Sequence, residues 1–199
     1  MKKDFIIHHF RFKAFWYLIK KIRTFFFSIS GAQIGKGTLL SSCYIPWPSQ
    51  VSIGKYCRLE HGIYFKFDNI HKAGRNIIIG NQVFLGAFCE FNITDSIHIG
   101  DYCLIASGCK FIDHDHGFYL DQKIGANGKE EKIIIGENVW LGCNVVVLKG
   151  VIIEDGAIVA AGSVVTKNIK KYEIWGGVPA KKISTRSQYL RKENNSNEK

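Results

Sequence analysis

The chain has 199 residues, of which 46% are hydrophobic, and its 27 Lys and Arg residues against 17 Asp and Glu residues give a formal net charge of +10. This length predicts one globular domain with a core of its own. The positive charge favours an acidic partner, such as an anionic lipid surface or a phosphorylated small molecule. No motif of a DNA- or RNA-binding module accompanies the charge, so we expect no nucleic-acid partner.

The cysteines and the N-terminal residues bear on the cellular compartment in which the protein is expected. Six cysteines are spread through the chain, and no two of them form a Cys-x-x-Cys pair. No cleavable signal-peptide pattern is expected at the start, because His8, His9, Arg11 and Lys13 interrupt the apolar residues there. The sequence therefore predicts free thiols and a cytoplasmic location.

Residues 1–30 form a basic, aromatic segment that we expect to be helical. Residues 10–29 read FRFKAFWYLIKKIRTFFFSI, and Lys20, Lys21 and Arg23 within the most apolar part argue against a membrane span. The composition is typical of a helix lying peripherally at the inner face of a membrane. A helix that caps the open end of the following domain fits the residues equally well.

An internal repeat organises the rest of the chain. Ile-Gly recurs at Ile34, Ile53, Ile79, Ile99 and Ile135, and from position 135 the units IGENVW, LGCNVV, VLKGVI, IEDGAI and VAAGSV follow one another. Three such hexads make one step of eighteen residues. This period predicts a solenoid with three short flat sides, in which the first and fifth places of each hexad point inward.

Small residues at the fifth place should lie near the corners of the coils, where a bulky group would clash. Cys57, Cys89, Cys103 and Cys109 all occupy this place. We therefore interpret these four thiols as buried apolar filler.

The pattern resembles the hexapeptide-repeat acyltransferases, most closely the galactoside and maltose acetyltransferases and the O-antigen and capsule O-acetyltransferases. The resemblance covers residues 31–183 and implies a left-handed parallel β-helix, with helical segments at both ends, that assembles as a homotrimer. Residues 117–134 are interpreted as a loop insertion and residues 184–199 as a polar tail. The closing motif WGGVPAKKI resembles the family's GxPA, and Pro179 is expected to end the sheet character.

The stretch FIDHDHGF supplies two candidate catalytic residues, His114 and His116, where the chain leaves the coil for its longest insertion. Histidine suits a general base because its pKa lies near neutrality. A gapless match from LIASG to IGENVWLG with the sugar-acetylating branch places His116 at the catalytic position. His114 then lies beside it or orients it.

The resemblance also implies binding residues for acetyl-CoA, the co-substrate, and for the acceptor. Cys143 stands where the family often has Ser and is expected to act through its backbone N–H, whereas Lys167 and either Lys181 or Lys182 are expected to meet CoA phosphates. The acetyl-CoA candidates are Trp140, Cys143, Ala161, Thr166, Lys167 and Lys181, and the acceptor candidates are Glu90, Asn92 and Asp95, with Asp113 as a further possibility.

The resemblance implies direct transfer of an acetyl group to a sugar hydroxyl, on a free or lipid-linked saccharide, in polysaccharide biosynthesis. Acylation of an amino sugar is an alternative. A zinc hydratase on the same fold is another, because His98 lies eighteen residues before His116 and the two could stack in adjacent coils with His61 or His71 as a third ligand. A non-catalytic scaffold is the third alternative. For the preferred reading we expect no metal.

Overall fold

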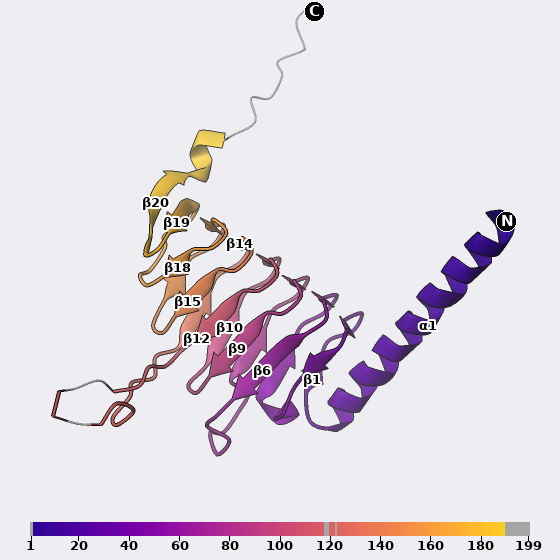
Figure 1. Ribbon diagram of the computed structural model, residues 1–199, viewed down its shortest axis with the longest axis horizontal. Helices are drawn as coiled ribbons and strands as arrows, with labels where there is room; N and C mark the ends of the chain where they lie inside the picture. The colour runs from indigo at the N-terminus through magenta and orange to yellow at the C-terminus, as the bar shows by residue number, and fades with distance from the viewer. Residues whose placement is uncertain (1, 118–119, 122, 190–199) are drawn as a thin grey trace, which may run out of the picture.

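The structure, a computed structural model, describes residues 2–117, 120–121 and 123–189, and the side chains of 13–117, 120–121 and 123–187. A long helix, α1 (Lys2–Ile29), precedes a parallel β-solenoid and diverges from it (Figure 1). The helix expected at the N-terminus is therefore present. The side chains of Phe10, Arg11 and Phe12 and residues 190–199 of the expected tail lie outside the described part.

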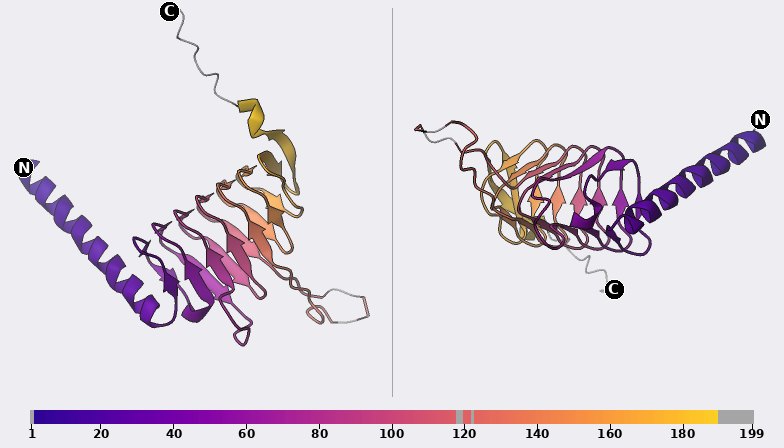
Figure 2. Two further views of the ribbon diagram at one scale, coloured as in Figure 1. Left: turned by 180° about the vertical axis from the view of Figure 1, so that it is seen from behind. Right: turned by 90° about the horizontal axis from the view of Figure 1, so that it is seen from below.

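The solenoid has three sheets, because successive strands of each coil lie on different sides (Figures 1 and 2). Sheet A contains β1 (Gln33–Ile34), β4 (Val51–Ile53), β7 (Ile77–Ile79), β10 (Ile97–Ile99), β13 (Ile133–Ile135) and β16 (Ile152–Ile153). Sheet B contains β2 (Leu39–Leu40), β5 (Arg58–Leu59), β8 (Phe84–Leu85), β11 (Leu104–Ile105), β14 (Trp140–Leu141), β17 (Ile158–Val159), β19 (Glu173–Gly177) and β20 (Ala180–Thr185). Sheet C contains β3 (Cys43–Tyr44), β6 (Ile63–Phe67), β9 (Glu90–Ile93), β12 (Lys110–Ile112), β15 (Val146–Leu148) and β18 (Val164–Val165). Short 3-10 helices span Pro48–Gln50 and Arg186–Tyr189.

The core is a column of inward-facing side chains, as the repeat predicts. Phe65, Phe91 and Phe111 stack from coil to coil with ring centroids 4.8 and 4.9 Å apart and are all buried. The four cysteines at the fifth place are buried as well, which confirms their interpretation as filler: Cys57, Cys89, Cys103 and Cys109.

The loop insertion leaves the coil earlier than the sequence suggested. Strand β12 ends at Ile112, β13 begins at Ile133, and an antiparallel bridge joins His114 to Glu130 at the base of the loop. The stack of His98 on His116 that the zinc alternative requires is not formed, because His98 lies in register between Ile78 and Ile134 in sheet A. The loop removes His116 from the position that a regular coil would give it.

The end of the domain is an antiparallel hairpin. Strand β19 pairs with β20, which begins at Ala180, so Pro179 lies at the turn and the sheet continues beyond it. The expectation that Pro179 ends the sheet is therefore wrong, because a hairpin turn leaves the proline outside the ladder. The expected C-terminal helical segment is limited to the 3-10 helix Arg186–Tyr189.

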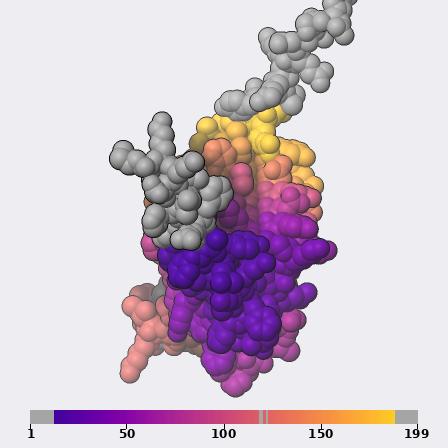
Figure 3. Space-filling model, turned by 90° about the vertical axis from the view of Figure 1, so that its right-hand side faces the viewer, coloured from indigo at the N-terminus to yellow at the C-terminus, as the bar shows by residue number. Residues whose placement is uncertain are grey.

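The side chains of helix α1 that bind the solenoid, among those the structure describes, include Thr24 and Phe27 near its C-terminal end. The backbone N–H of Leu40 donates to Thr24 Oγ1 at 3.1 Å, and Phe27 packs against the buried core. The end-on view shows the residues of α1 in front of the first coils, and the ribbon views show the rest of the helix projecting away from them (Figures 2 and 3). The last turns of the helix thus cap the first coil.

Candidate functional site

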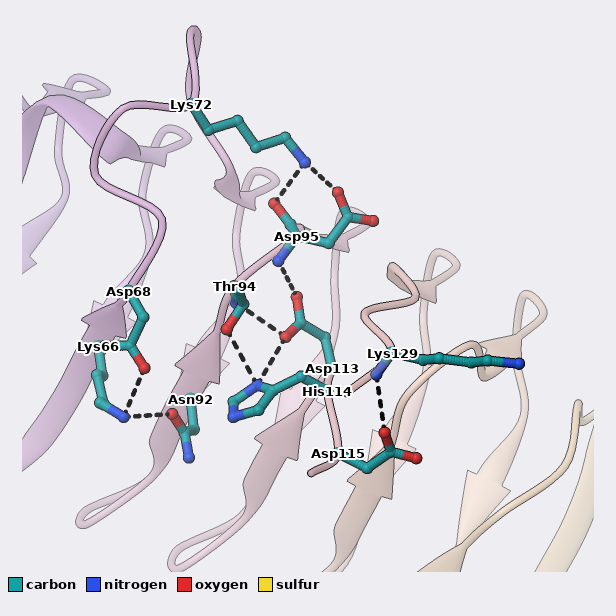
Figure 4. Close-up of polar contacts among 10 residues, drawn as sticks. All are labelled: Lys66, Asp68, Lys72, Asn92, Thr94, Asp95, Asp113, His114, Asp115 and Lys129. Atoms are coloured by element: carbon teal, nitrogen blue, oxygen red, sulfur yellow. Dashed lines mark hydrogen bonds and ion pairs between the residues drawn. The ribbon is translucent and has the colours of Figure 1, made fainter. Parts of the chain in front are cut away.

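The candidate site begins at the carboxyl edge of sheet C, by which we mean the ends of strands β9, β12, β15 and β18. Asp113 follows β12 directly, and its side chain is fully buried. Its two carboxylate oxygens accept the backbone N–H groups of Thr94 and Asp95, each at 2.8 Å, from the coil below (Figure 4). Burial raises the pKa of Asp113, while these hydrogen bonds oppose the rise.

His114 is held by this buried carboxylate. Its Nδ1 lies 3.2 Å from Asp113 Oδ1 and 3.2 Å from Thr94 Oγ1 (Figure 4). Because an ionised carboxylate can only accept a hydrogen bond, Nδ1 of His114 is the donor in its contact with Asp113. This contact gives the His114 ring a defined orientation.

His116 has an exposed ring on a fixed backbone. The ring lies edge-on to that of His114, with centroids 6.1 Å apart. The preceding residue is clamped, since Asp115 N–H donates to Lys129 O at 3.1 Å and Lys129 N–H donates to Asp115 Oδ1 at 2.9 Å (Figure 4). After it, Gly117 is packed so closely that a Cβ there would lie 1.5 Å from Ala126 O. The exposed imidazole is therefore presented to solvent from a rigid base.

The acceptor candidates Glu90 and Asn92 lie on the outer face of sheet C, half-buried on β9 and in register with β12. Each has a lysine partner: Lys110 Nζ lies 2.5 Å from Glu90 Oε2, and Lys66 Nζ donates to Asn92 Oδ1 at 3.0 Å. This face therefore offers paired charges and amide groups, a surface suited to hydroxyl-rich ligands.

Asp95 is engaged by the protein itself. Its carboxylate pairs with Lys72, and its N–H donates to Asp113 (Figure 4). It also lines a hollow of about 370 Å³ beside the base of the insertion, with Glu131, Lys132, Gly150 and Ile152. The ion pair with Lys72 was not foreseen, and it engages the carboxylate of an acceptor candidate.

The phosphate-binding candidates line one hollow at the C-terminal end. Thr166, Lys167, Lys181 and Lys182 come together around a space of about 280 Å³ that Trp175, Pro179 and Ala180 also line. Lys182 Nζ lies 2.7 Å from Glu173 Oε1, so its charge is already paired. Lys167 and Lys181 are the better candidates for a bound phosphate.

The remaining CoA candidates lie on sheet B and at the corner that follows it. Trp140 begins β14 with 51% of its surface exposed, pointing outward. Cys143 and Ala161 occupy equivalent corners of consecutive coils, both exposed, and Gly162 N–H donates to Cys143 O at 2.8 Å. Trp140, Cys143 and Ala161 are thus all exposed on the surface of the solenoid.

The fold brings the histidines and the phosphate candidates to one edge. Strands β12, β15 and β18 are neighbours in sheet C, and the residues that follow them are Asp113, Lys149 and Thr166. Adjacent strands lie about 4.8 Å apart, so the ends of β12 and β18 are separated by roughly 10 Å. Lys149 was not foreseen; its ammonium group lies 3.2 Å from Asp115 and 3.3 Å from Glu131, which links the insertion to the next coil.

Two findings bear on membranes and metals. Among the residues that the structure describes, no helix is long and apolar enough to cross a membrane. Within that same part of the chain, no three His, Cys, Asp or Glu side chains are grouped as a metal site would require.

Comparison with known proteins agrees with the repeat. Residues 132–167 match the family described as bacterial transferase hexapeptide (six repeats), and residues 76–109 match the hexapeptide repeat of succinyl-transferase. Protein CapG of Staphylococcus aureus is 42% identical over 132 residues, which cover 61% of this chain and 72% of CapG. Polysialic acid O-acetyltransferase of Escherichia coli O1:K1 is 39% identical over 132 residues, 64% of this chain and 42% of that protein.

A solved structure shares the fold. A mutant of AntD, an N-acyltransferase from Bacillus cereus, in complex with dTDP and coenzyme A, has a TM-score of 0.71 at 23% identity and covers 81% of this chain and 88% of its own. The parallel solenoid and the sequence matches define a class of protein, the hexapeptide-repeat transferases. The chain belongs to this family and is an acetyltransferase of the hexapeptide-repeat type.

Proposed function

We propose that the protein transfers the acetyl group of acetyl-CoA to a sugar hydroxyl in polysaccharide biosynthesis. The observation that carries this proposal is the gathering of three sets of residues along sheet C. Glu90 and Asn92 lie on its outer face, the histidines follow β12, and Lys167 follows β18. An acceptor, a base and a CoA anchor are the three parts that acyl transfer to a hydroxyl requires.

The chemistry is direct transfer without a covalent enzyme intermediate. His116 takes the hydroxyl proton while the acceptor oxygen attacks the thioester carbonyl, which forms a tetrahedral oxyanion. Backbone donors near Cys143 stabilise this oxyanion. When the C–S bond breaks, the CoA thiolate leaves and recovers the proton from His116. His114, fixed by Asp113, limits the orientations open to the neighbouring imidazole.

Acetyl-CoA is proposed to run from the histidines toward the C-terminal hollow. The phosphates would meet Lys167 and Lys181, because Lys182 is paired with Glu173. The AntD structure, which contains coenzyme A on the same fold, agrees with a CoA site here. One relative is named as a polysialic acid O-acetyltransferase, and this name supports a saccharide as the acceptor and a hydroxyl rather than an amine as the acylated group.

We propose that the coils wind left-handed and that three copies assemble, with the site between them. Support for assembly comes from an apolar row on the outer face of sheet B. Phe84, Leu104, Trp140 and Ile158 lie in register on adjacent strands, and Leu104 and Trp140 are 53% and 51% exposed. Such a row is costly to leave in water, and a second copy would cover it.

The test compares two histidine variants with a matched control. We expect His116→Ala to lose about 10² to 10⁴ in turnover while its acetyl-CoA affinity changes only a few-fold. His98→Ala is the control, since His98 lies in register on sheet A, away from the candidate site. Thiol release is measured with free sugars, nucleotide sugars and lipid-linked oligosaccharides, and mass spectrometry identifies the product.

Two outcomes would contradict the proposal. If His114→Ala is inactive and His116→Ala is active, the base is His114, which Asp113 already orients. If acetyl-CoA is consumed only with amino sugars and the product is an amide, the reaction is N-acetylation.

A further inference from the structure

Helix α1 turns an apolar stripe toward solvent. Phe15, Leu18, Ile22, Phe25 and Ile29 follow one another at intervals of three and four residues, so they lie on one side of the helix. Their exposed fractions are 57%, 55%, 59%, 67% and 66%. A helix that served only as a cap would bury such a stripe against the solenoid.

The opposite side of the helix makes the contacts with the solenoid. Thr24 and Phe27 lie three residues apart, on the side away from the stripe, and they bind Leu40 and the core. In the ribbon views the N-terminal part of α1 projects beyond the first coil (Figures 1 and 2). The stripe and the projecting turns are thus displayed by the fold rather than covered by it.

The charges on and around the helix have one sign. Lys13 and Lys21 are exposed, and Lys20 and Arg23 are half-buried on the same helix. From position 5 to position 59 the sequence has no Asp or Glu at all. This end of the molecule therefore combines exposed aromatic and aliphatic groups with uncompensated positive charge.

We infer that α1 binds the surface of an anionic lipid membrane, with the stripe at the boundary of headgroups and acyl chains and the net positive charge of the helix attracting it to the anionic surface. A second copy is the less favourable occupant, because pairing two such helices would bring only like charges together. This inference goes beyond the proposed function and does not rest on it. It also separates two roles of one helix: the last turn closes the solenoid, and the stripe binds lipid.

The experiment uses the full chain and vesicles of two compositions, phosphatidylcholine alone and phosphatidylcholine with 30% phosphatidylglycerol. We expect co-sedimentation with the anionic vesicles at low salt and release at high salt, because salt screens the attraction. Lys13→Gln with Lys21→Gln should lower the partition coefficient roughly thirtyfold, since each cation near the surface contributes about 1 kcal/mol.

The stripe is tested separately. Ile22→Ser with Phe25→Ser should abolish vesicle binding, whereas Ile78→Ser, an exposed isoleucine on sheet A, should not change it. Acetyl transfer to a soluble acceptor should be the same in all these variants, so failure of the lipid proposal and failure of the proposed function can be told apart.

The inference is wrong if the protein ignores anionic vesicles at low salt. It is also wrong if light scattering shows a larger assembly that Ile22→Ser with Phe25→Ser dissociates while vesicle binding is absent, because the stripe then covers a second copy.

Discussion

The buried carboxylate of Asp113 offers a sharp test of how the site is held. Asp113→Ala removes the acceptor of two backbone N–H groups, those of Thr94 and Asp95, and the partner of His114. Each buried donor left without a partner costs about 1–3 kcal/mol, so the free energy of unfolding should fall by about 2–6 kcal/mol. For a chain of this size, 1 kcal/mol shifts Tm by about 2–4 °C, which predicts a drop of about 4–24 °C.

The drop is measured by circular dichroism, with Asp68→Ala as the control. Asp68 forms an ion pair with Lys66 at 2.7 Å, but its side chain is 44% exposed. Exposed ion pairs contribute about 0–1 kcal/mol to the free energy of unfolding. We also expect Asp113→Ala to reduce turnover at temperatures where it is fully folded, because His114 loses its fixed orientation. A Tm within 1 °C of the unmodified protein would refute the reasoning, since no buried acceptor would then have been lost.

Two further predictions concern the thiols and the assembly. N-ethylmaleimide should modify the exposed Cys143 well before the buried Cys103, whose thiol pKa is raised to about 11 by burial, and bound acetyl-CoA should slow the modification of Cys143 several-fold. Cys143→Ser should remove the fast phase of modification and keep substantial transferase activity. Loss of all activity together with a trapped acyl adduct would indicate covalent catalysis instead. If three copies assemble as proposed, Leu104→Lys should give smaller species by light scattering, because it places a charge from each copy in the apolar row, whereas Ile78→Lys on sheet A should not. An unchanged mass for Leu104→Lys would place the interface elsewhere.

The core of this fold could be predicted from sequence because the inward-facing positions are set by a short repeat of neighbouring residues. A hexad specifies which side chains face inward within six residues, and the burial of Phe91, Cys89 and Ile99 follows from that pattern alone. Thr166 and Lys167, which the resemblance to the family suggests as CoA contacts, line a common hollow, a placement that the hexad pattern does not itself specify. Local spacing is enough wherever the coil is regular.

Contacts that cross an irregular segment could not be predicted in this way. His98 is eighteen residues from His116, but the insertion moves His116 out of the coil, so the spacing misleads. The ion pair of Lys72 with Asp95 depends on a loop whose path no repeat specifies, and the pairing of Lys182 with Glu173 depends on a bulge in the hairpin. In each case the missing information was the path of the chain between two known positions.

The insertion also explains how a rigid solenoid can carry a site at this point. Strand β12 still pairs with β9 and β15, and β13 still pairs with β10 and β16, so a loop of about twenty residues interrupts no ladder. Leaving at a corner costs mainly the entropy of closing the loop, and the bridge of His114 with Glu130 fixes its base. The residues that follow β12 lie outside the coil, so they need not be small or apolar to fit its core. Histidines can therefore occupy these positions, and the ladders on either side keep the backbone there in place.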